Sequence, residues 1–184
     1  MVQLKNDKSK PGNLNEFLLW EPNDGFKYEW FDGEIIKSEK RNRKHLKLIK
    51  KLARLFLKTN AHKEGGELIT EQDVLLTGIQ LRRPDLAFFS AEQISNSDNP
   101  DAEEPIPAFA IEVISTSDQL SIVKGKLKEY FAHGVKAVWL IYPDEKLVEV
   151  YTSFKNVTIC TENDLCSAGP ALPDFEISVN DLFS

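Results

Sequence analysis

Two acidic residues stand beside or inside short apolar runs, where an unpaired carboxylate is costly. Asp85 directly precedes the apolar run 86–89, and Glu112 lies in the middle of the apolar run 109–114. Runs of this length that are bounded by proline or polar residues are typical of buried strands. An ionised carboxylate in such a place destabilises the fold unless a partner compensates its charge. Two such acids on neighbouring strands are what a divalent metal site requires.

The residues around the two acids favour a hard cation. Neither acid has a histidine or cysteine beside it in the sequence, and carboxylate oxygens suit Mg²⁺ or Mn²⁺ better than zinc. Strand alternation places Glu112 on the same face as Ala110, which leaves room for an ion. Further along, Lys126 and Tyr130 are four residues apart on one face of a predicted helix. A lysine there could reach the metal site and orient a water molecule.

Each of these residues also has a purely structural interpretation. Asp85 could pair with the adjacent Arg82 or Arg83, and for a lone aspartate this is the more common arrangement. Glu112 could hydrogen-bond to a buried lysine or tyrosine. Taken singly, the helical lysine and tyrosine are most often a snorkelling side chain and a half-buried aromatic ring. The constellation is therefore a stronger signal than any one member.

The order of predicted elements favours a mixed sheet flanked by helices. A strand, a helix and a second strand over residues 108–142 predict a crossover between parallel strands, while the other strands read as antiparallel. We expect an α/β (α+β) fold. The predicted elements are a helix at 15–20, a hairpin at 28–36 around Asp32-Gly33, a helix at 44–60, strands at 67–76 and 83–89, a surface loop at 90–107, a strand at 108–114, a helix at 119–133, and strands at 137–142, 146–152, 157–160 and 175–179.

The predicted helix at 44–60 is amphipathic, with a basic side. His45 falls on its apolar side, where a satisfied core or capping histidine is the commoner explanation. The apolar positions are Leu46, Ile49, Leu52, Ala53, Phe56 and Leu57. The opposite side carries a basic stripe formed by Lys44, Lys47, Lys51, Arg54 and Lys58.

The charge of the chain is unevenly distributed. The formal net charge is −6, but residues 37–63 contain eleven Lys or Arg against one acid, so that segment is strongly positive and the remainder strongly negative. Such asymmetry indicates an anionic partner such as nucleic acid. The alternative is a solvated lysine-rich helix face that needs no partner.

Length and composition predict one ordinary globular domain. The chain of 184 residues fits a flexible leader at 1–14 followed by a single domain at 15–184. No apolar stretch reaches the length of a membrane span and no signal peptide is visible, so we expect a cytoplasmic protein. Cys160 and Cys166 match no common zinc spacing and are expected to be free thiols.

The motifs together resemble a known family. The chain looks like the Uma-two family, a group of restriction-endonuclease-like proteins within the PD-(D/E)XK nuclease superfamily. The resemblance extends over roughly residues 15–183, and the order and spacing of its short motifs are fairly specific. It rests on Arg83-Pro84-Asp85, Ile111-Glu112-Val113-Ile114-Ser115, Lys126, Tyr130, Gly134-Val135 and Trp139-Leu140, with Tyr28-Glu29, Asp32-Gly33-Glu34 and His45 upstream.

The resemblance implies a restriction-endonuclease-like fold and a metal-dependent phosphodiesterase core. Asp85 would take the place of the superfamily's motif aspartate and Glu112 that of its second acid. Both would hold Mg²⁺ (or Mn²⁺), helped by the backbone carbonyl of Val113. The superfamily's lysine would stand two residues after the second acid, where this chain has Ile114. In the resembling family this lysine lies on the following helix, which corresponds to Lys126.

Further site residues follow from the same resemblance. Lys124 would be a weaker substitute for the catalytic lysine, and Tyr130 a supporting residue. Glu34 would be the extra upstream acid, ahead of Glu29 and His45.

The implied activity is hydrolysis of DNA by a metal-activated water, with the basic stripe holding the phosphate backbone without reading sequence. A homodimer is expected by analogy, because cutting both strands needs two sites. The alternative is a non-catalytic module that binds nucleic acid or protein and retains the nuclease fold. The overall acidity and the displaced lysine favour that alternative, while the strand acids and the helical lysine favour the enzyme.

Overall fold

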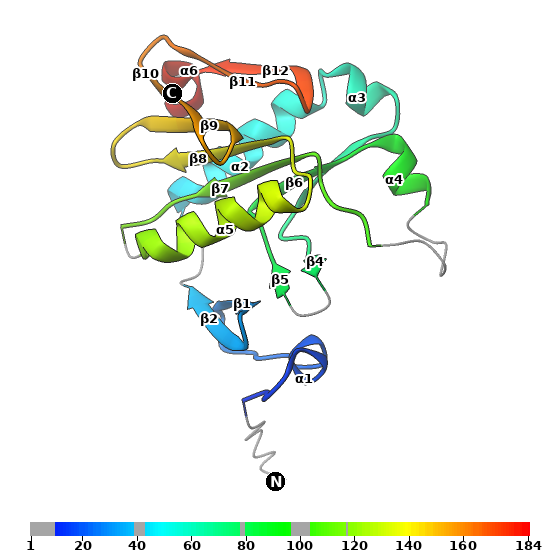
Figure 1. The fold of residues 1–184 in the computed structure, drawn as a ribbon. Helices are drawn as coiled ribbons and strands as arrows, with labels where there is room; N and C mark the ends of the chain where they lie inside the picture. The colour runs from blue at the N-terminus through cyan, green and yellow to red at the C-terminus, as the bar shows by residue number, and fades with distance from the viewer. Residues whose placement is uncertain (1–9, 39–42, 78–79, 97–103, 117) are drawn as a thin grey trace, which may run out of the picture.

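The computed structural model describes residues 10–38, 43–77, 80–96, 104–116 and 118–184 (Figure 1). The helices are α1 (Leu14–Leu18), α2 (Arg43–Phe56), α3 (Asn60–Lys63), α4 (Ala91–Ser95), α5 (Leu120–Ala132) and α6 (Val179–Phe183). The strands are β1 (Lys27–Phe31), β2 (Glu34–Ser38), β3 (Glu67–Thr70), β4 (Val74–Thr77), β5 (Gln80–Arg82), β6 (Leu86–Phe89), β7 (Phe109–Val113), β8 (Ala137–Tyr142), β9 (Leu147–Ser153), β10 (Asn156–Thr161), β11 (Leu165–Ala168) and β12 (Leu172–Ser178).

The central element is a mixed six-stranded sheet in the order β10-β9-β8-β7-β6-β3. β7 and β8 are parallel, and α5 connects them, as the strand–helix–strand pattern predicts. The other pairings in this sheet are antiparallel. The predicted mixed α/β architecture, a sheet flanked by helices, is therefore confirmed.

The two faces of the central sheet are covered by different elements. Alternate strand residues on one face pack against α2, α6 and the two-stranded sheet β11-β12, with Trp139 and Phe175 among the most buried side chains. The other face packs against α5 and β4. In Figure 1, α5 and α2 lie on opposite sides of the strands. Ala110 packs on the α5 face. Strand alternation places Glu112 on the same face as Ala110, as predicted.

A smaller sheet in the order β2-β1-β5-β4 lies below the central sheet in Figure 1. β1 and β2 form the predicted hairpin, with Trp30 opposite Ile35. The turn residues Asp32 and Gly33 have φ of 49° and 81°. Tight hairpin turns need this left-handed conformation, and glycine adopts it without steric cost. The hairpin packs with α1 through a small aromatic cluster that contains Phe17 and Trp30.

Several expected boundaries differ from the structure. The predicted strand at 67–76 is two strands: β3 joins the central sheet and β4 the smaller one. The chain bends between them at Glu71, whose φ is 54°. The predicted loop at 90–107 contains α4, which begins with a capping box between Ser90 and Gln93. The predicted helix at 44–60 ends as α2 at Phe56 and is followed by α3.

The predicted apolar side of the helix at 44–60 is partly wrong. Leu46 and Leu57 are 44% and 57% exposed, whereas Leu48 is buried instead. The buried arc of α2 therefore includes Leu48, which belongs to the same core cluster as the α6 residues Val179 and Leu182.

The C-terminal region is more regular than the sequence suggests. β11 and α6 were not expected, and β12 is longer than the predicted strand at 175–179. Cys160 and Cys166 are free, as expected, and both are buried. Of the expected leader at 1–14, residues 1–9 lie outside the described part of the chain, so that expectation and the single-domain assignment stay predictions. None of the helices in the described ranges is long and apolar enough to cross a membrane.

Candidate active site

The pairing of β6 with β7 brings the two strand acids together. The strands are antiparallel, with Leu86 opposite Ile111, so the beginning of β6 lies beside the end of β7. The Asp85 backbone N–H donates to the Ile111 carbonyl at 3.0 Å. Its carboxylate Oδ2 accepts from the Val113 N–H at 2.7 Å. Asp85 and Glu112 are only 4% and 5% exposed, which confirms that both acids are buried on adjacent strands.

Helix α5 supplies the predicted lysine and tyrosine. Lys126 Nζ lies 3.3 Å from Glu112 Oε1, and the Tyr130 hydroxyl donates to the same oxygen at 2.7 Å. The spacing of four residues places both side chains on the face of α5 that packs on the sheet. The structure therefore brings Lys126 to Glu112, although the two residues are fourteen positions apart in the sequence.

Strand β1 contributes two further charged residues. Its period of two places Lys27 and Glu29 on one face, while Tyr28 and Trp30 enter the small aromatic cluster. Glu29 is 3% exposed, and its Oε1 lies 2.8 Å from Lys126 Nζ. From the sequence, Glu29 was a less favoured candidate than Glu34, and Lys27 was not predicted to take part in the site. The available signal was the alternation of charged with aromatic residues along the strand.

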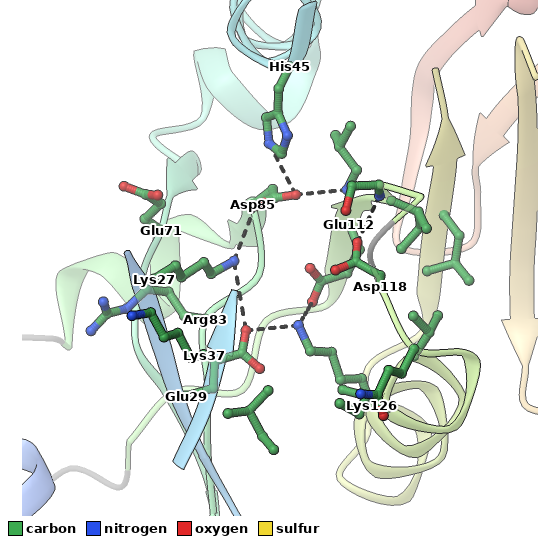
Figure 2. A pocket seen from close by; sticks show the side chains of 18 of the residues that line it. Lys27, Glu29, Lys37, His45, Glu71, Arg83, Asp85, Glu112, Asp118 and Lys126 are labelled. Atoms are coloured by element: carbon green, nitrogen blue, oxygen red, sulfur yellow. Dashed lines mark hydrogen bonds and ion pairs between the residues drawn. The ribbon is translucent and has the colours of Figure 1, made fainter. Parts of the chain in front are cut away.

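Figure 2 shows the resulting chain of opposite charges. Lys27 Nζ lies 3.2 Å from Asp85 Oδ1 and 3.7 Å from Glu29 Oε1. Glu29 then contacts Lys126, which reaches Glu112. Three carboxylates thus alternate with two ammonium groups across β6, β1, α5 and β7. Charge pairing of this kind is what allows so many ionised groups to be buried together.

An arginine lies behind this chain of charges. Arg82 is fully buried and forms a two-pronged pair with Glu129 on α5, at 2.7 and 3.1 Å. Its Nη1 also reaches Glu29 Oε2 at 3.4 Å, and its guanidinium stacks on Phe31 at 4.1 Å. The arginine beside Asp85, Arg83, pairs with Asp73 instead. The structural alternative in which an adjacent arginine neutralises Asp85 is therefore not what the structure shows.

The N-terminal end of α2 also reaches the site. His45 Nε2 lies 3.3 Å from Asp85 Oδ2, and its side chain is 15% exposed. Asp85 therefore has contacts from three elements: β7 through Val113, α2 through the imidazole, and β1 through Lys27. A histidine in this position can hold the orientation of the carboxylate.

Other predicted site residues lie away from this group. Glu34 is exposed at the start of β2, paired in register with Phe31, and does not line the site cavity. Glu29, on the preceding strand of the hairpin, is buried and lines the cavity instead. Lys124 hydrogen-bonds to the Tyr151 hydroxyl at 2.7 Å and is likewise absent from the cavity wall.

The basic stripe lies on the outer side of α2, opposite the residues that pack on the sheet. Lys44 pairs with Asp144 at 3.0 Å, and Lys51 hydrogen-bonds to the Ser184 hydroxyl at 2.8 Å. The remaining members are exposed: Lys47, Arg54 and Lys58. The stripe therefore does not line the site, although the first turn of the same helix does.

The charged group opens into a cavity of about 510 Å³. Its wall combines the charged residues above with apolar side chains, among them Phe26, Leu46 and Ile122. Arg83 and Glu71 also line it, and Figure 2 shows them on the side of Asp85 and Lys27, away from Glu112. A volume of this size accommodates a ligand as large as a nucleotide.

Burial and charge pairing shift several pKa values in the site. Burial raises the pKa of Glu112 above its usual value, against the opposing effect of Lys126 and Lys27. Burial also acts on Glu29, but there the ammonium groups of Lys126 and Lys27 prevail and hold the pKa below its usual value. The Lys126 pKa lies above its ordinary value because the two carboxylates outweigh its burial. Burial together with Glu112 raises the pKa of Tyr130 well above its usual value.

The donor set of the site fits a hard divalent cation. Asp85 and Glu112 offer carboxylate oxygens from adjacent strands, and within the described part of the chain no protein group donates a hydrogen bond to Glu112 Oε2. The carboxylates of this group outnumber its ammonium groups, and the pKa of Glu112 is raised. A bound cation would stabilise the ionised carboxylates. Among the residues that the structure describes, no three His, Cys, Asp or Glu side chains converge closely enough to form a complete metal cage. Waters and substrate oxygens would complete the coordination, as is usual for Mg²⁺.

Comparisons with known proteins give the wider context for this site. The family model Uma2, described as "Putative restriction endonuclease", matches residues 14–180. Among solved structures, the chain is similar to the "Crystal structure of a putative nuclease belonging to DUF820 from Anabaena variabilis ATCC 29413". The two are 24% identical with a TM-score of 0.77, and the match covers 94% of this chain and 98% of that chain. A search of curated proteins finds no match.

The structural neighbour shows that the fold is shared with a protein described as a "putative nuclease". The family model spans most of the chain and includes all three residues of the predicted core, Asp85, Glu112 and Lys126. The chain therefore belongs to the Uma2 (Uma-two) family, whose description is "Putative restriction endonuclease".

Proposed function

We propose that the protein is a metal-dependent endonuclease of the PD-(D/E)XK type that hydrolyses DNA phosphodiester bonds. The observation that carries the proposal is the meeting of two buried strand carboxylates with a helical ammonium in one cavity. Lys126 Nζ lies 3.3 Å from Glu112, and Asp85 is anchored to the same strand at Val113. Family membership supports the same class of activity.

The two strand acids are the proposed ligands of Mg²⁺ or Mn²⁺, together with the backbone carbonyl of Val113. A bound ion would polarise the phosphoryl oxygens, lower the pKa of a coordinated water and offset the charge that develops in the transition state. In this proposal, the surrounding residues hold the Asp85 carboxylate in place for the ion. The Val113 N–H and His45 both contact Oδ2, which restricts rotation of the carboxylate.

The proposed role of Lys126 is electrostatic. Because its pKa is raised, the ammonium stays protonated at neutral pH and cannot act as a general base. It can donate hydrogen bonds to the attacking water and to the phosphoryl oxygens as negative charge builds up. Glu29 holds it at 2.8 Å, and Tyr130 fixes the orientation of Glu112 by donating to the same oxygen. Glu29 is therefore proposed to act as a positioning residue.

DNA is the proposed partner, and two different regions of the protein would contact or attract it. The cavity would receive the scissile phosphate, while the exposed part of the basic stripe would attract the DNA backbone at long range.

A homodimer is proposed on the ground that double-strand cleavage needs two sites. Sedimentation at micromolar concentration measures this directly, and a mass of one chain would contradict it.

The experiment that tests the activity is cleavage of supercoiled and relaxed plasmid DNA in Mg²⁺ and in Mn²⁺. We expect metal-dependent nicking or linearisation by the native chain. Asp85→Asn and Glu112→Gln should each lose at least about a hundredfold in rate, because each removes a proposed ligand charge. Lys126→Met should lose a similar factor while retaining metal binding. Lys128→Gln on the exposed side of α5 is the matched control and should cleave normally.

Cleavage that persists in both acid variants would assign the activity to a contaminating nuclease and reject the proposal. Metal binding without cleavage of any DNA would instead favour the non-catalytic binding module. One observation supports that second candidate: the Lys27 ammonium already lies on Asp85, where it neutralises the acid without a metal.

A further inference from the structure

Lys27 is a charged residue of the site to which the proposed cleavage assigns no role. Its Nζ lies 3.2 Å from Asp85 Oδ1 and 3.7 Å from Glu29 Oε1. Its side chain is 13% exposed and lines the cavity. β1 positions it, because Lys27 and Glu29 share the face of the strand that points into the site. The ammonium is thus held between two carboxylates at the edge of the space where a ligand would lie.

The two oxygens of Asp85 have different partners. Oδ2 accepts from the Val113 N–H at 2.7 Å and lies 3.3 Å from His45 Nε2. Oδ1 is the oxygen that the Lys27 ammonium contacts. Because the backbone of β7 fixes Oδ2, a divalent cation that binds Asp85 must compete with Lys27 for Oδ1.

The charges of the site make this competition unequal. Three carboxylates face the two ammonium groups of Lys27 and Lys126, and Arg82 is paired with Glu129. Among these groups there is therefore one more negative than positive charge. A divalent cation would reverse that balance, and repulsion between like charges a few ångströms apart would then weaken the hold of Asp85 on Lys27.

We propose that Lys27 is an exchangeable counter-ion: it neutralises Asp85 in the metal-free site, and it moves to the substrate phosphate when a divalent cation takes Asp85. This inference rests on the proposed function and adds a second phosphate-binding lysine to it. Glu29 remains close enough to keep the displaced ammonium at the cavity wall. A phosphodiester oxygen would replace the lost carboxylate with a hydrogen bond of the same charge-assisted kind.

The first arm of the test is calorimetric titration with Mn²⁺ alone. Lys27→Gln removes the competing charge but can still donate a hydrogen bond to Asp85 Oδ1, so the site keeps a partner for the buried acid. We expect this variant to bind Mn²⁺ about tenfold more tightly than the native chain, because one positive charge near the ion is lost. Lys27→Arg, which keeps the charge, and Lys128→Gln, which removes a charge from the exposed side of α5, should bind as the native chain does.

The second arm measures the affinity for a short DNA duplex by fluorescence anisotropy, with and without Ca²⁺ as a divalent ion that slows cleavage. In Ca²⁺ we expect Lys27→Gln to bind DNA about tenfold more weakly than the native chain, since a phosphate contact is lost. Without metal, where Lys27 is on Asp85, the two proteins should bind alike. Thermal unfolding of each variant shows that it is folded, and Lys27→Arg provides a second reading if Lys27→Gln does not fold.

The outcomes separate this inference from the proposed function. Tighter Mn²⁺ binding together with a metal-dependent loss of DNA affinity supports the exchange. Unchanged or weaker Mn²⁺ binding by Lys27→Gln overturns it, as does an equal loss of DNA affinity with and without Ca²⁺. With Lys27→Arg alone, native Mn²⁺ affinity supports it and tighter binding overturns it. If the native chain binds metal but no DNA, the nuclease proposal and the transfer to phosphate both fail, while the calorimetric arm still decides whether Lys27 is the counter-ion of Asp85.

Discussion

At the scale of single residues, the site depends on which carboxylates are compensated and which are not. Glu29 has three cationic neighbours, Lys126, Lys27 and Arg82, and its pKa lies below the usual value. Glu112 is equally buried but has one cationic contact, and its pKa is raised. Two buried glutamates of one site therefore contribute to stability with opposite sign.

Glu112→Gln is expected to stabilise the protein at neutral pH. A carboxyl whose folded pKa is raised resists ionisation, so the native state loses stability as pH rises above the usual carboxyl range. Removing the charge should therefore raise the free energy of unfolding at pH 7 by roughly 0.5–2 kcal/mol, the scale seen when function costs stability. Denaturant unfolding between pH 4 and pH 8 measures this, and the gain should shrink toward acid pH.

Equal or lower stability of Glu112→Gln at pH 7 would contradict this account. Lys126 keeps Glu29 at 2.8 Å in the variant, so the loss of one carboxylate does not leave the ammonium alone.

Glu29→Gln is expected to destabilise the protein. A carboxyl whose folded pKa is lowered contributes stability above the usual carboxyl range and loses it as pH falls through the folded pKa. The variant also leaves Lys126 and Lys27 with one carboxylate fewer, and breaking a buried pair typically costs about 3–5 kcal/mol. Urea unfolding at pH 7 should show a loss of that order, with a smaller difference from the native chain near pH 4. A neutral effect at pH 7 would show that the charges rearrange freely.

At the scale of elements, the hairpin β1-β2 determines where Lys27 and Glu29 lie. Its turn depends on Gly33, whose φ is 81°. Gly33→Ala should lower stability by about 1 kcal/mol, because alanine is disfavoured in the left-handed region. Gly125→Ala is the contrasting control: it lies within α5, a Cβ there would lie at an ordinary 3.6 Å from Phe31, and the helix should gain up to about 1 kcal/mol.

Thermal unfolding of the two glycine variants measures these opposite shifts. Destabilisation by both substitutions in equal measure would mean that backbone conformation is not what distinguishes the two sites.

Helix α2 has two groups of polar residues, and they lie on different sides of it. His45 at its first turn contacts Asp85, while Lys47, Arg54 and Lys58 on or just beyond it are exposed on the outer side. Changing the latter three to glutamine should raise KM for DNA several-fold at low salt and leave kcat unchanged. The difference should vanish near 0.3 M salt, where charges are screened within about 6 Å. A lower kcat would show that the stripe contacts the reacting DNA directly.

At the scale of the whole molecule, the sequence predicted the parts of the site that share a simple period. Asp85 precedes an apolar run, Glu112 lies inside one, and Lys126 and Tyr130 follow helical spacing, so their positions could be predicted. The pairing of β6 with β7 then placed the two acids together, as adjacent strands require.

The contribution of the hairpin could not be predicted in the same way. The contact between Lys27 and Asp85 joins β1 of the smaller sheet to the residue just before β6, 58 positions away, and no local pattern specifies it. Glu29 and Glu34 both flank the turn, and only the contact of Glu29 with Lys126 on α5 shows which of the two is buried. The split of residues 67–76 into β3 and β4 depends on Glu71, a non-glycine residue with positive φ that sequence patterns do not reveal.

The central claim is that Asp85 and Glu112 form a divalent metal site, and titration calorimetry with Mg²⁺ and Mn²⁺ tests it most directly. The account predicts saturable binding by the native chain that Asp85→Asn and Glu112→Gln each abolish, while Lys128→Gln binds normally. No binding at millimolar metal, or binding that both acid variants retain, would contradict it.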